Sequence, residues 1–463
     1  MNLSPMNPSH TKPLLILGTG LAGYTLAREF RKLDQARPLV LVTADDGSAY
    51  AKPNLSNALA TDRSAEALVQ SDAAGMATQL QAQVLTRHRV ITINTEARQV
   101  HVAPIDDLRD DIREDIRRGT QKDAACATHA PVEIIDYAQL VLALGAEPLP
   151  LPITGNAADH IRSVNDLEDY RAFRDALSRC TAPARVAILG GGLIGCEFAN
   201  DLAIAGHAVQ VIDIAPQALG RLLPSDLPGA VRGPAQALQQ ALQQTGVQWH
   251  LGRSLKAIQH SAAASTLELQ LDNGDSLDAD LVLSAVGLAP RTALAASAGL
   301  QIGRGIVTNQ CLQTSARHVY ALGDCAEVNG MLLPYVMPIM HGARALAATL
   351  ASYQDTNDSV QAQSVHYPPM PVSVKTPALP ITVCSPAMGS AGAWVAASTA
   401  NADTNAIEAH FLSPEGKLLG FALTGTACSR RSALVRALVR ALVRPLGDAL
   451  SSSDVRSGCS GPG

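Results

Sequence analysis

Two glycine-rich segments in this 463-residue sequence have a spacing of glycines that is typical of a binding site. Both place glycines at the first, third and sixth positions, which are Gly18, Gly20 and Gly23 in one segment and Gly190, Gly192 and Gly195 in the other. In such a turn the first glycine permits a tight bend, the second lets the backbone approach a pyrophosphate, and the third allows close helix–strand packing. Unpaired N–H groups at the start of the following helix attract phosphate.

An acidic residue follows each turn, at the end of the next apolar run. Asp45 follows residues 39–42, and Asp213 follows residues 209–212. A carboxylate there can accept hydrogen bonds from an adenosine ribose, although Asp46 could serve in place of Asp45. At Asp213 it suits a free 2′-hydroxyl and repels a 2′-phosphate, which favours NADH over NADPH. One glycine turn alone is weak evidence, but two copies, each with its acid, predict two dinucleotide sites.

The elements that must position these turns repeat a strand–turn–helix order. Apolar runs at 14–17 and 185–189 predict the strands before the turns, and helices are expected after them, through Arg31 and over 196–205. Further runs at 139–144 and 281–286 predict strands that close each nucleotide domain. The predicted fold class is α/β, with two Rossmann-like nucleotide-binding domains and a small C-terminal α+β domain.

Composition and charge narrow the function further. A chain with 47% hydrophobic residues can bury two or three cores, and its net charge of −5 argues against nucleic acid as a partner. The eight cysteines are scattered, so neither a Cys-x-x-Cys pair nor a zinc quartet is visible and no metal site is predicted. No leader and no apolar stretch of bilayer length is seen, which predicts a cytoplasmic protein without a transmembrane segment.

The ordered motifs resemble those of the FAD-dependent pyridine-nucleotide oxidoreductases, flavoproteins that bind two nucleotides. The resemblance runs from Leu14 to about Thr424, and its segments are 18–24, 43–47, 52–56, 165–170, 193–202, 284–288, 320–327, 335–338 and 374–377. Within this superfamily the chain is most similar to the members that reduce rubredoxin. It departs from them in a charged insertion at 106–123, which we interpret as a solvated segment, and in a longer, basic C-terminal region.

The resemblance implies which domain holds which cofactor. It places FAD on residues 13–155 and 284–365, NADH on residues 156–283, and a separate C-terminal domain on 366–446, followed by a disordered tail at 447–463. It implies that Asp324 bonds the FAD ribityl chain. The expected cofactor-binding residues are Gly18, Gly20, Leu21, Ala22, Gly23, Asp45, Lys52, Pro53, Gly145, Gly190, Gly192, Gly195, Glu197, Asp213, Gly287, Asp324, Met337 and Lys375.

Three charged residues are the candidate catalytic groups, as tuning and positioning residues and not as nucleophiles. Lys52 lies in a segment that approaches the flavin in this superfamily. Lys375 interrupts an apolar strand at 372–374, and it either faces the flavin or forms a surface ion pair. Glu197, in the first helical turn after Gly195, is either a surface carboxylate at the helix dipole or a group near the nicotinamide.

The cysteine positions indicate how electrons leave the flavin. Relatives that reduce disulfides or peroxide carry a redox cysteine in the first domain, whereas no cysteine precedes Cys126 here. Cys196, Cys325 and Cys384 are expected to be packing residues. Hydride from NADH would therefore pass to the flavin, and single electrons to rubredoxin. The alternatives are a reductase for ferredoxin or another oxygenase carrier, and an NADH-binding redox sensor.

A basic repeat near the C-terminus is the remaining feature. Arg436, Arg440 and Arg444 are four residues apart and share one helical face, with leucine and valine opposite. The simplest interpretation is a solvated face of a helix that packs on the third domain. Docking of an acidic protein, as small rubredoxins are, and attachment to a membrane surface are the alternatives.

Overall fold

The computed structural model describes residues 12–107, 132–224, 227–228, 232–261, 266–397 and 405–443. The chain forms two compact units, the first of residues 1–219 with 242–367 and the second of residues 220–241 with 368–463. From residue 108 onward the expected charged insertion lies outside the described residues. The expected tail at 447–463 lies outside them as well.

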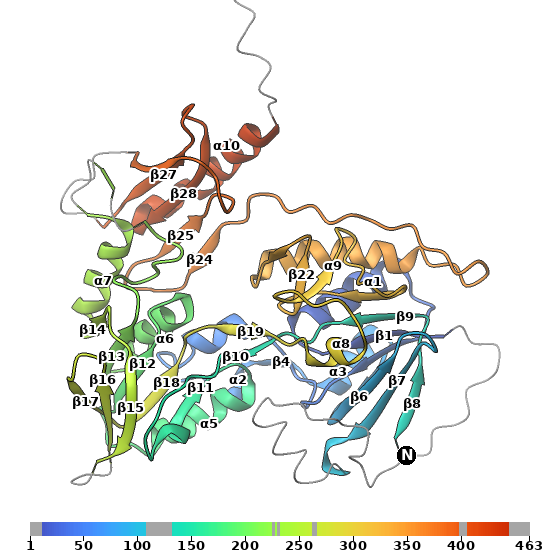
Figure 1. Cartoon of the computed structure of the whole chain (residues 1–463), viewed down its shortest axis with the longest axis horizontal. Coiled ribbons are helices and arrows are strands. Elements are labelled where there is room, and N and C mark those ends of the chain that lie inside the picture. The colour runs from blue at the N-terminus through green and yellow to red at the C-terminus, as the bar shows by residue number, and fades with distance from the viewer. Residues whose placement is uncertain are drawn as a thin grey trace, which may run out of the picture. The chain divides into compact units, whose positions relative to one another are not determined.

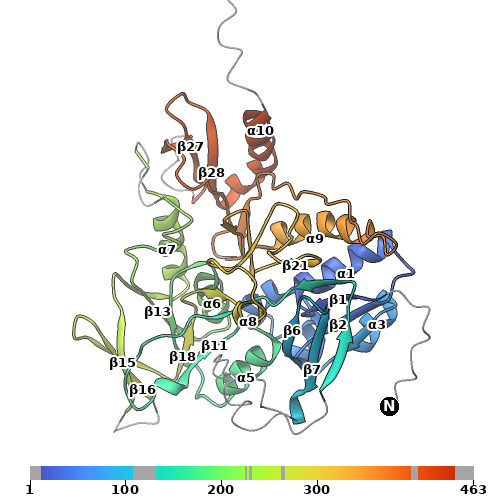
Figure 2. The ribbon, with the colours of Figure 1, turned by 45° about the vertical axis from the view of Figure 1, so that its right-hand side comes forward.

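The first parallel sheet carries the first glycine turn. Its strands follow the order β21-β9-β1-β2-β5 and are β1 Leu14–Leu17, β2 Leu39–Val42, β5 Gln83–Leu85, β9 Gln139–Leu142 and β21 Val319–Ala321. All the residues of β1 and β2 are buried, as expected for parallel strands covered on both faces. Helices α1 (Leu21–Leu33) and α9 (Val336–Ala351) pack side by side, as both views show (Figures 1 and 2).

The second parallel sheet, in the same unit, repeats this plan around the second glycine turn. Its order is β11-β18-β12-β13-β14, with β11 Ile161–Ser163, β12 Arg185–Leu189, β13 Ala208–Asp213, β14 Gln248–Leu251 and β18 Leu281–Ser284. Its helices are α5 (Leu167–Ser178) and α6 (Leu193–Ile204). Since β12 pairs in parallel with both β13 and β18, the turn after β12 opens at the carboxyl edge of the sheet.

Smaller elements complete the first unit. Its antiparallel sheets comprise β6 His88–Asn94, β7 Gln99–Pro104 and β8 Glu133–Asp136; β15 Leu255–His260, β16 Leu267–Leu271 and β17 Ser276–Ala279; β3 Ala49–Tyr50 and β4 Val69–Ser71; and β10 Ala146–Pro148 and β19 Leu288–Pro290. A mixed sheet holds β20 Ile306–Thr308, β22 Ala326–Val328 and β23 Met331–Leu332. The short helices are η1 Lys52–Asn57, α2 Ala65–Leu68, α3 Ala73–Leu80, η2 Ile105–Asp107, η4 Ala158–His160 and α8 Ala293–Ser297. Helix α7 (Pro234–Gln244) spans the boundary between the units along the chain.

The second unit contains an antiparallel sheet and one long helix. The sheet order is β24-β25-β28-β27-β26, with β24 Val372–Val374, β25 Ile381–Cys384, β26 Ala393–Ala396, β27 Glu408–Leu412 and β28 Leu418–Thr424. After η5 (Gly425–Arg430), helix α10 (Arg431–Val443) packs Leu434 and Leu438 into the core with Phe421. Residues 220–241 group with this unit, whereas the boundaries expected from the sequence place them with the second sheet.

The exposed face of α10 agrees with the predicted amphipathic pattern. Arg436 and Arg440 are exposed, while Leu434 and Leu438 are buried on the opposite face. Arg444 lies outside the described residues. The interpretation of this stretch as a helix that packs on the C-terminal sheet is therefore confirmed for the residues that the structure describes.

The predicted strands at 14–17, 39–42 and 185–189 are confirmed, but two others are shorter than expected. β9 ends at Leu142 and β18 at Ser284, because the next backbone must turn to meet the glycine loops. Gly18 lies against the carbonyl of Ala143, and Gly190 against that of Ala285. Helix α6 also begins three residues earlier than predicted, at Leu193, directly after the turn. Among the described residues, no helix is both long and apolar enough to cross a bilayer.

Candidate active site

The first glycine turn has the geometry of a pyrophosphate cradle. Gly18 has a φ of +108°, and a Cβ on Gly23 would collide with the carbonyl of Gly18, so both positions require glycine. At Gly20, by contrast, a Cβ would meet no protein atom within 4 Å. Helix α1 starts at Leu21 with Gly20 as its N-cap and no side-chain cap. The open space above Gly20 and the uncapped helix end fit a dinucleotide pyrophosphate.

Asp45 is joined to this turn, and Asp46 is not. Asp45 Oδ1 accepts hydrogen bonds from Thr43 Oγ1 at 2.6 Å, from the Gly47 N–H at 2.9 Å and from Thr19 Oγ1, within the turn, at 3.3 Å. Asp46 Oδ1 accepts instead from the exposed Ser48 N–H. Of the two acids left open by the sequence, Asp45 therefore has the better position for an adenosine ribose.

A lysine, Lys52, and an acid, Asp324, influence each other's pKa. The loop that carries Asp324 packs on helix α1, since a Cβ on Gly323 would lie 2.8 Å from that of Ala22. Burial raises the pKa of Asp324, and Lys52 counteracts this rise. Burial lowers the pKa of Lys52, while the charge of Asp324 opposes that fall. Both groups are half-buried, and the charge of each favours the ionised form of the other.

Lys52 is held in place by an amide from another element. Lys52 Nζ donates to Asn165 Oδ1 at 2.6 Å, and Asn165 Nδ2 donates to the Ala146 carbonyl at 3.0 Å. Asn165 is 6% exposed. It lies between β11 and α5, so the loop after the first strand of the second sheet holds the ammonium group of Lys52.

The second glycine turn repeats the first in detail. Gly190 has a φ of +102°, Gly195 packs on the carbonyl of Gly190, and a Cβ on Gly192 would meet nothing within 4 Å. The accompanying acid, however, is bonded differently. Asp213 Oδ2 accepts from the Gly191 N–H and Asp213 Oδ1 accepts from the Ala215 N–H at 2.7 Å. This places a half-buried carboxylate directly at the turn, where a 2′-phosphate would meet negative charge.

Glu197 is buried, so its interpretation as a surface carboxylate is wrong. It is 2% exposed, and its Oε2 accepts from Ser56 Oγ at 2.5 Å and from Asn57 Nδ2 at 3.3 Å. These donors belong to η1, which begins with Lys52 and Pro53. The structure therefore brings Glu197 of the second nucleotide region together with the segment that carries Lys52.

The remaining predicted cofactor residues occupy different places. Gly145 and Gly287 have φ values of +69° and +127° and lie at opposite ends of the antiparallel β10–β19 ribbon. Met337, in the first turn of α9, is 42% exposed. Lys375 belongs to the second unit, directly after β24, where it is half-buried. Its expected place at the flavin stays a prediction.

Three polar residues were not assigned a role from the sequence, although they lie in the segments that carry the resemblance. They are Ser56, Asn165 and Asp201. Asp201 is 4% exposed and accepts from the Leu59 N–H at 2.7 Å and the Ala60 N–H at 3.2 Å. The available signal was an acid four residues after Glu197 in a mostly apolar helix, a spacing that puts both on one helical face.

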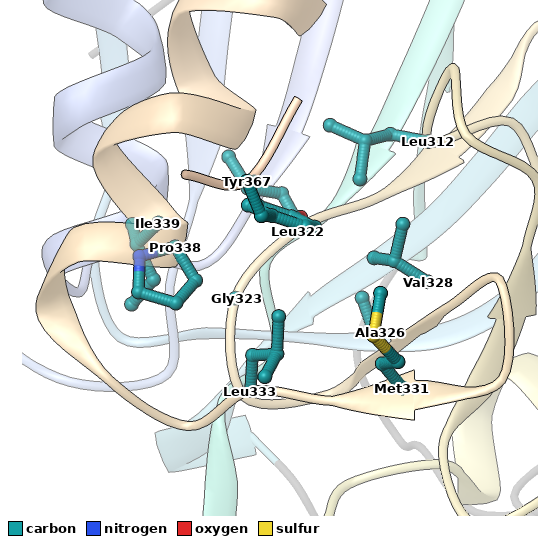
Figure 3. A pocket seen from close by; sticks show the side chains of 10 residues that line it. All are labelled: Leu312, Leu322, Gly323, Ala326, Val328, Met331, Leu333, Pro338, Ile339 and Tyr367. Atoms are coloured by element: carbon teal, nitrogen blue, oxygen red, sulfur yellow. The ribbon is translucent and has the colours of Figure 1, made fainter. Parts of the chain in front are cut away.

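An apolar pocket supports the loop that carries Asp324 (Figure 3). It is lined by side chains from the β21–β23 region, the start of α9 and the segment that follows that helix, namely Leu312, Leu322, Gly323, Ala326, Val328, Met331, Leu333, Pro338, Ile339 and Tyr367. Apart from the phenol of Tyr367 this lining offers no polar side chain. The pocket contributes packing, and the polar groups of the candidate site lie outside it.

Cysteine chemistry is disfavoured in the part of the chain that the structure describes. The six cysteines within it are free, and Cys196, Cys325 and Cys384 are buried, as predicted. Burial raises the pKa of all three thiols, which keeps them protonated and unreactive. Within the described ranges, no group of three or more His, Cys, Asp or Glu side chains could hold a metal ion.

Comparison with known families decides the class of this site. Residues 12–347 match the family model described as "Pyridine nucleotide-disulphide oxidoreductase". The chain belongs to this family. The predicted superfamily and α/β fold class are thereby confirmed, and with them the use of two nucleotides, FAD and NAD. Residues 364–438 match a second model, described as "Rubredoxin binding C-terminal domain".

Individual relatives extend this membership over nearly the whole chain. The chain is similar to Rubredoxin-NAD(+) reductase of Acinetobacter baylyi, at 44% identity over 79% of this chain and 82% of that protein. It is also similar to Rubredoxin-NAD(+) reductase of Alcanivorax borkumensis, at 43% identity over 91% and 97%. The covalent putidaredoxin reductase–putidaredoxin complex aligns with a TM-score of 0.75 at 23% identity, over 93% of this chain and 94% of that chain, which supports the fold.

Proposed function

We propose that this chain is an NADH-dependent FAD flavoprotein that reduces rubredoxin. The observation that carries the proposal is the rubredoxin-binding match at residues 364–438, on a chain whose residues 12–347 belong to a two-nucleotide oxidoreductase family. When bound, FAD accepts a hydride from NADH and releases the electrons singly to an acceptor. The cysteines are consistent with direct transfer, since those described are free and the first in the sequence is Cys126.

The first sheet is the proposed FAD domain, with residues 13–155 and 284–365. Gly18, Gly20 and Gly23, with Leu21 and Ala22 at the helix start, would hold the pyrophosphate through backbone N–H groups. Asp45 would accept hydrogen bonds from the adenosine ribose, and Asp324 from the ribityl hydroxyls. Support comes from the open space at Gly20 and from the bond between Asp45 and Thr19.

The second sheet is the proposed NADH domain, within residues 156–283. Gly190, Gly192 and Gly195 would hold the pyrophosphate, and Asp213 would bind the free 2′-hydroxyl. Glu197 would lie near the nicotinamide, since it is buried at the first turn of α6 against η1. A buried carboxylate there would orient a neutral amide by accepting hydrogen bonds from its N–H groups.

Lys52 and Lys375 would provide positive charge for the reduced flavin. Lys52 is held by its hydrogen bond to Asn165, so the position of its charge is fixed. Met337 and the N-terminal turn of α9 would add the helix dipole, worth about 0.3–1 kcal/mol. Residues 366–446 would form the docking domain for rubredoxin, and a cytoplasmic location is proposed because the described thiols are free.

The test compares acceptors under matched conditions. Purified yellow protein is mixed with NADH, and the reduction of rubredoxin and of a ferredoxin is followed at equal concentration and ionic strength. We expect kcat/KM for rubredoxin to exceed that for ferredoxin by at least about tenfold, or roughly 1.4 kcal/mol. Faster ferredoxin reduction would favour the alternative reductase. Bound NADH with no turnover on either acceptor would favour the redox sensor.

A further inference from the structure

The segment of residues 52–60, which we call the η1 segment, is held at three points by residues of the second nucleotide region. Lys52 Nζ donates to Asn165 at 2.6 Å, and Ser56 Oγ donates to Glu197 at 2.5 Å. At its end, two successive backbone N–H groups, those of Leu59 and Ala60, donate to Asp201. Asn165 and Asp201 have no part in the cofactor contacts proposed above.

Asp201 is built into this contact as a charged cap. Its side chain is buried, and burial raises its pKa while the N–H groups of Leu59 and Ala60 oppose that rise. A buried carboxylate is costly unless donors compensate it, and here each oxygen has its own donor. The same two N–H groups belong to residues that follow the 3-10 turn ending at Asn57, and Asp201 satisfies both of these backbone donors.

Glu197 and Asp201 lie four residues apart and present one face of α6 to the η1 segment. Asp201 binds backbone N–H groups, so this contact fixes where the η1 segment lies, independently of the segment's side chains. Glu197 binds the side chains of Ser56 and Asn57, so its contact depends on where Asp201 has placed them. The two acids therefore have separable roles.

We propose that Asp201 is a positioning residue for hydride transfer: by capping Leu59 and Ala60 it sets the place of Ser56 against Glu197. The inference rests on the proposed function. Hydride transfer depends steeply on the distance and angle of the reacting groups, and a misplacement of about 1 Å can cost roughly 100-fold in rate. A contact that fixes Ser56 and Glu197 relative to each other should therefore influence the rate more than the binding of NADH.

The test uses Asp201→Asn, which keeps the shape but replaces one acceptor oxygen with a donor. Asp280→Asn is the matched control, because Asp280 also accepts a backbone N–H, that of Arg185 at 2.7 Å, but from a strand start remote from η1. Amide hydrogen exchange at Leu59 and Ala60, measured on the apoprotein and on the FAD-loaded protein, reports the cap without reference to activity. We expect at least about tenfold faster exchange at both amides in Asp201→Asn alone.

Anaerobic stopped-flow reduction of the bound flavin supplies the second measurement. At saturating NADH we expect Asp201→Asn to be slower by about tenfold, with the half-saturating NADH concentration changed by less than about twofold. Reoxidation of the pre-reduced protein by rubredoxin should keep its rate. If Asp201 acts through Ser56, the double variant with Ser56→Ala should be no slower than the slower single variant, because coupled residues are not additive.

Several outcomes overturn the inference. One is that the amides of Leu59 and Ala60 in Asp201→Asn exchange as slowly as in the wild type. Another is that Asp201→Asn slows flavin reduction no more than Asp280→Asn does. A third is that the rate effects of Ser56→Ala and Asp201→Asn multiply in the double variant. Should Asp201→Asn fail to fold, Asp201→Glu keeps the charge but displaces it by one methylene, and the same exchange and rate changes are expected at smaller size. If NADH does not reduce the wild-type flavin, the proposed function fails, while hydrogen exchange still decides whether Asp201 fixes the segment.

Discussion

The two glycine turns share backbone features and differ in their surroundings. Gly18 and Gly190 have φ values of +108° and +102°, and the third glycine of each turn packs on the carbonyl of the first. Around the first turn, Asp45 accepts a hydrogen bond from Thr19, and the charge of Lys52 counteracts the rise in the pKa of Asp324. Around the second, Asp213 binds the turn itself and α6 buries two acids. We propose that each turn supplies phosphate binding and that the neighbouring charges decide which nucleotide it receives.

The largest effect should come from closing one cradle and leaving the other. Gly20→Val places carbon where the backbone is open and φ is −66°, so the protein can fold, but a pyrophosphate can no longer approach. We expect colourless protein, with FAD affinity lower by about 100-fold or more, equivalent to roughly 2.7 kcal/mol. The ratio of flavin to protein absorbance measures occupancy.

Gly192→Val is the matched control for this prediction, since its position is equally open and has a φ of −75°. It should remain yellow and lose reduction by NADH. A yellow Gly20→Val with full FAD occupancy, or a colourless Gly192→Val, would show that the two sheets have been assigned the wrong way round.

The next effect concerns the acid of the second turn. Asp213 should make kcat/KM for NADH exceed that for NADPH by tenfold or more, roughly 1.4 kcal/mol or above. Asp213→Asn should narrow this ratio, because the amide keeps an acceptor for the Gly191 N–H but no longer repels a 2′-phosphate. Asp45→Asn serves as the control and should leave the nucleotide preference unchanged. Equal efficiency with both nucleotides in the wild type would refute the role of Asp213.

A smaller, salt-dependent effect should separate the rubredoxin step from the NADH step. Because surface charges steer association and the Debye length falls to about 8 Å at physiological salt, kcat/KM for rubredoxin should drop as salt rises, and flavin reduction by NADH should not. Arg436→Glu with Arg440→Glu should slow only the rubredoxin step at low salt. We expect kcat/KM for rubredoxin at low salt to fall about tenfold.

The control pair for this prediction is Arg179→Glu with Arg253→Glu, which makes the same change of charge at exposed residues of the first unit. If both pairs behave alike, the effect is one of net charge. If the Arg436 and Arg440 pair matches the wild type at low salt, α10 is structural and the docking surface lies elsewhere, for example near Lys375.

The smallest expected effect is the pH dependence of stability that an ion pair gives to the first nucleotide region. In that region, Asp358 accepts two bonds from Arg98, at 2.9 and 2.6 Å, and one from Tyr353 at 2.9 Å. The hydrogen bonds from Arg98 hold the pKa of Asp358 well below its ordinary value. This stabilisation is present above the ordinary pKa of about 4 and is lost as pH falls below it.

Asp358→Asn should therefore lower the free energy of unfolding at pH 7 by about 1 kcal/mol, since the pair is partly exposed. The difference from the wild type should shrink from about pH 4 downward, as measured by urea unfolding at several pH values. Asp355→Asn, at an exposed position three residues away, should have no such effect. A constant difference at every pH would show that the ion pair is not its source.

The parts of the site that depend on residues close together in the sequence could be predicted from the sequence. The glycine turns, the strands before them and the acids after them form within about 30 residues, so local patterns were sufficient. The contact between Ser56 and Glu197, which are 141 residues apart, depends on how two sheets pack, and no local sequence pattern predicts it. For the same reason Glu197 was open to a surface interpretation, while the strand ends at Leu142 and Ser284 were set by the glycine loops that they meet.

Residues 220–241 affect where the second unit could be exchanged between related reductases. They group with the C-terminal sheet, and within that unit Arg232 donates to Asn405 Oδ1 at 2.7 Å. A chimaera joined at residue 367 would bring in a foreign sheet and keep the native Arg232. A second exchange, between β13 and β14, would be needed to bring in residues 220–241 together with the sheet that they group with, so the second unit is inherited as two separated stretches of the chain.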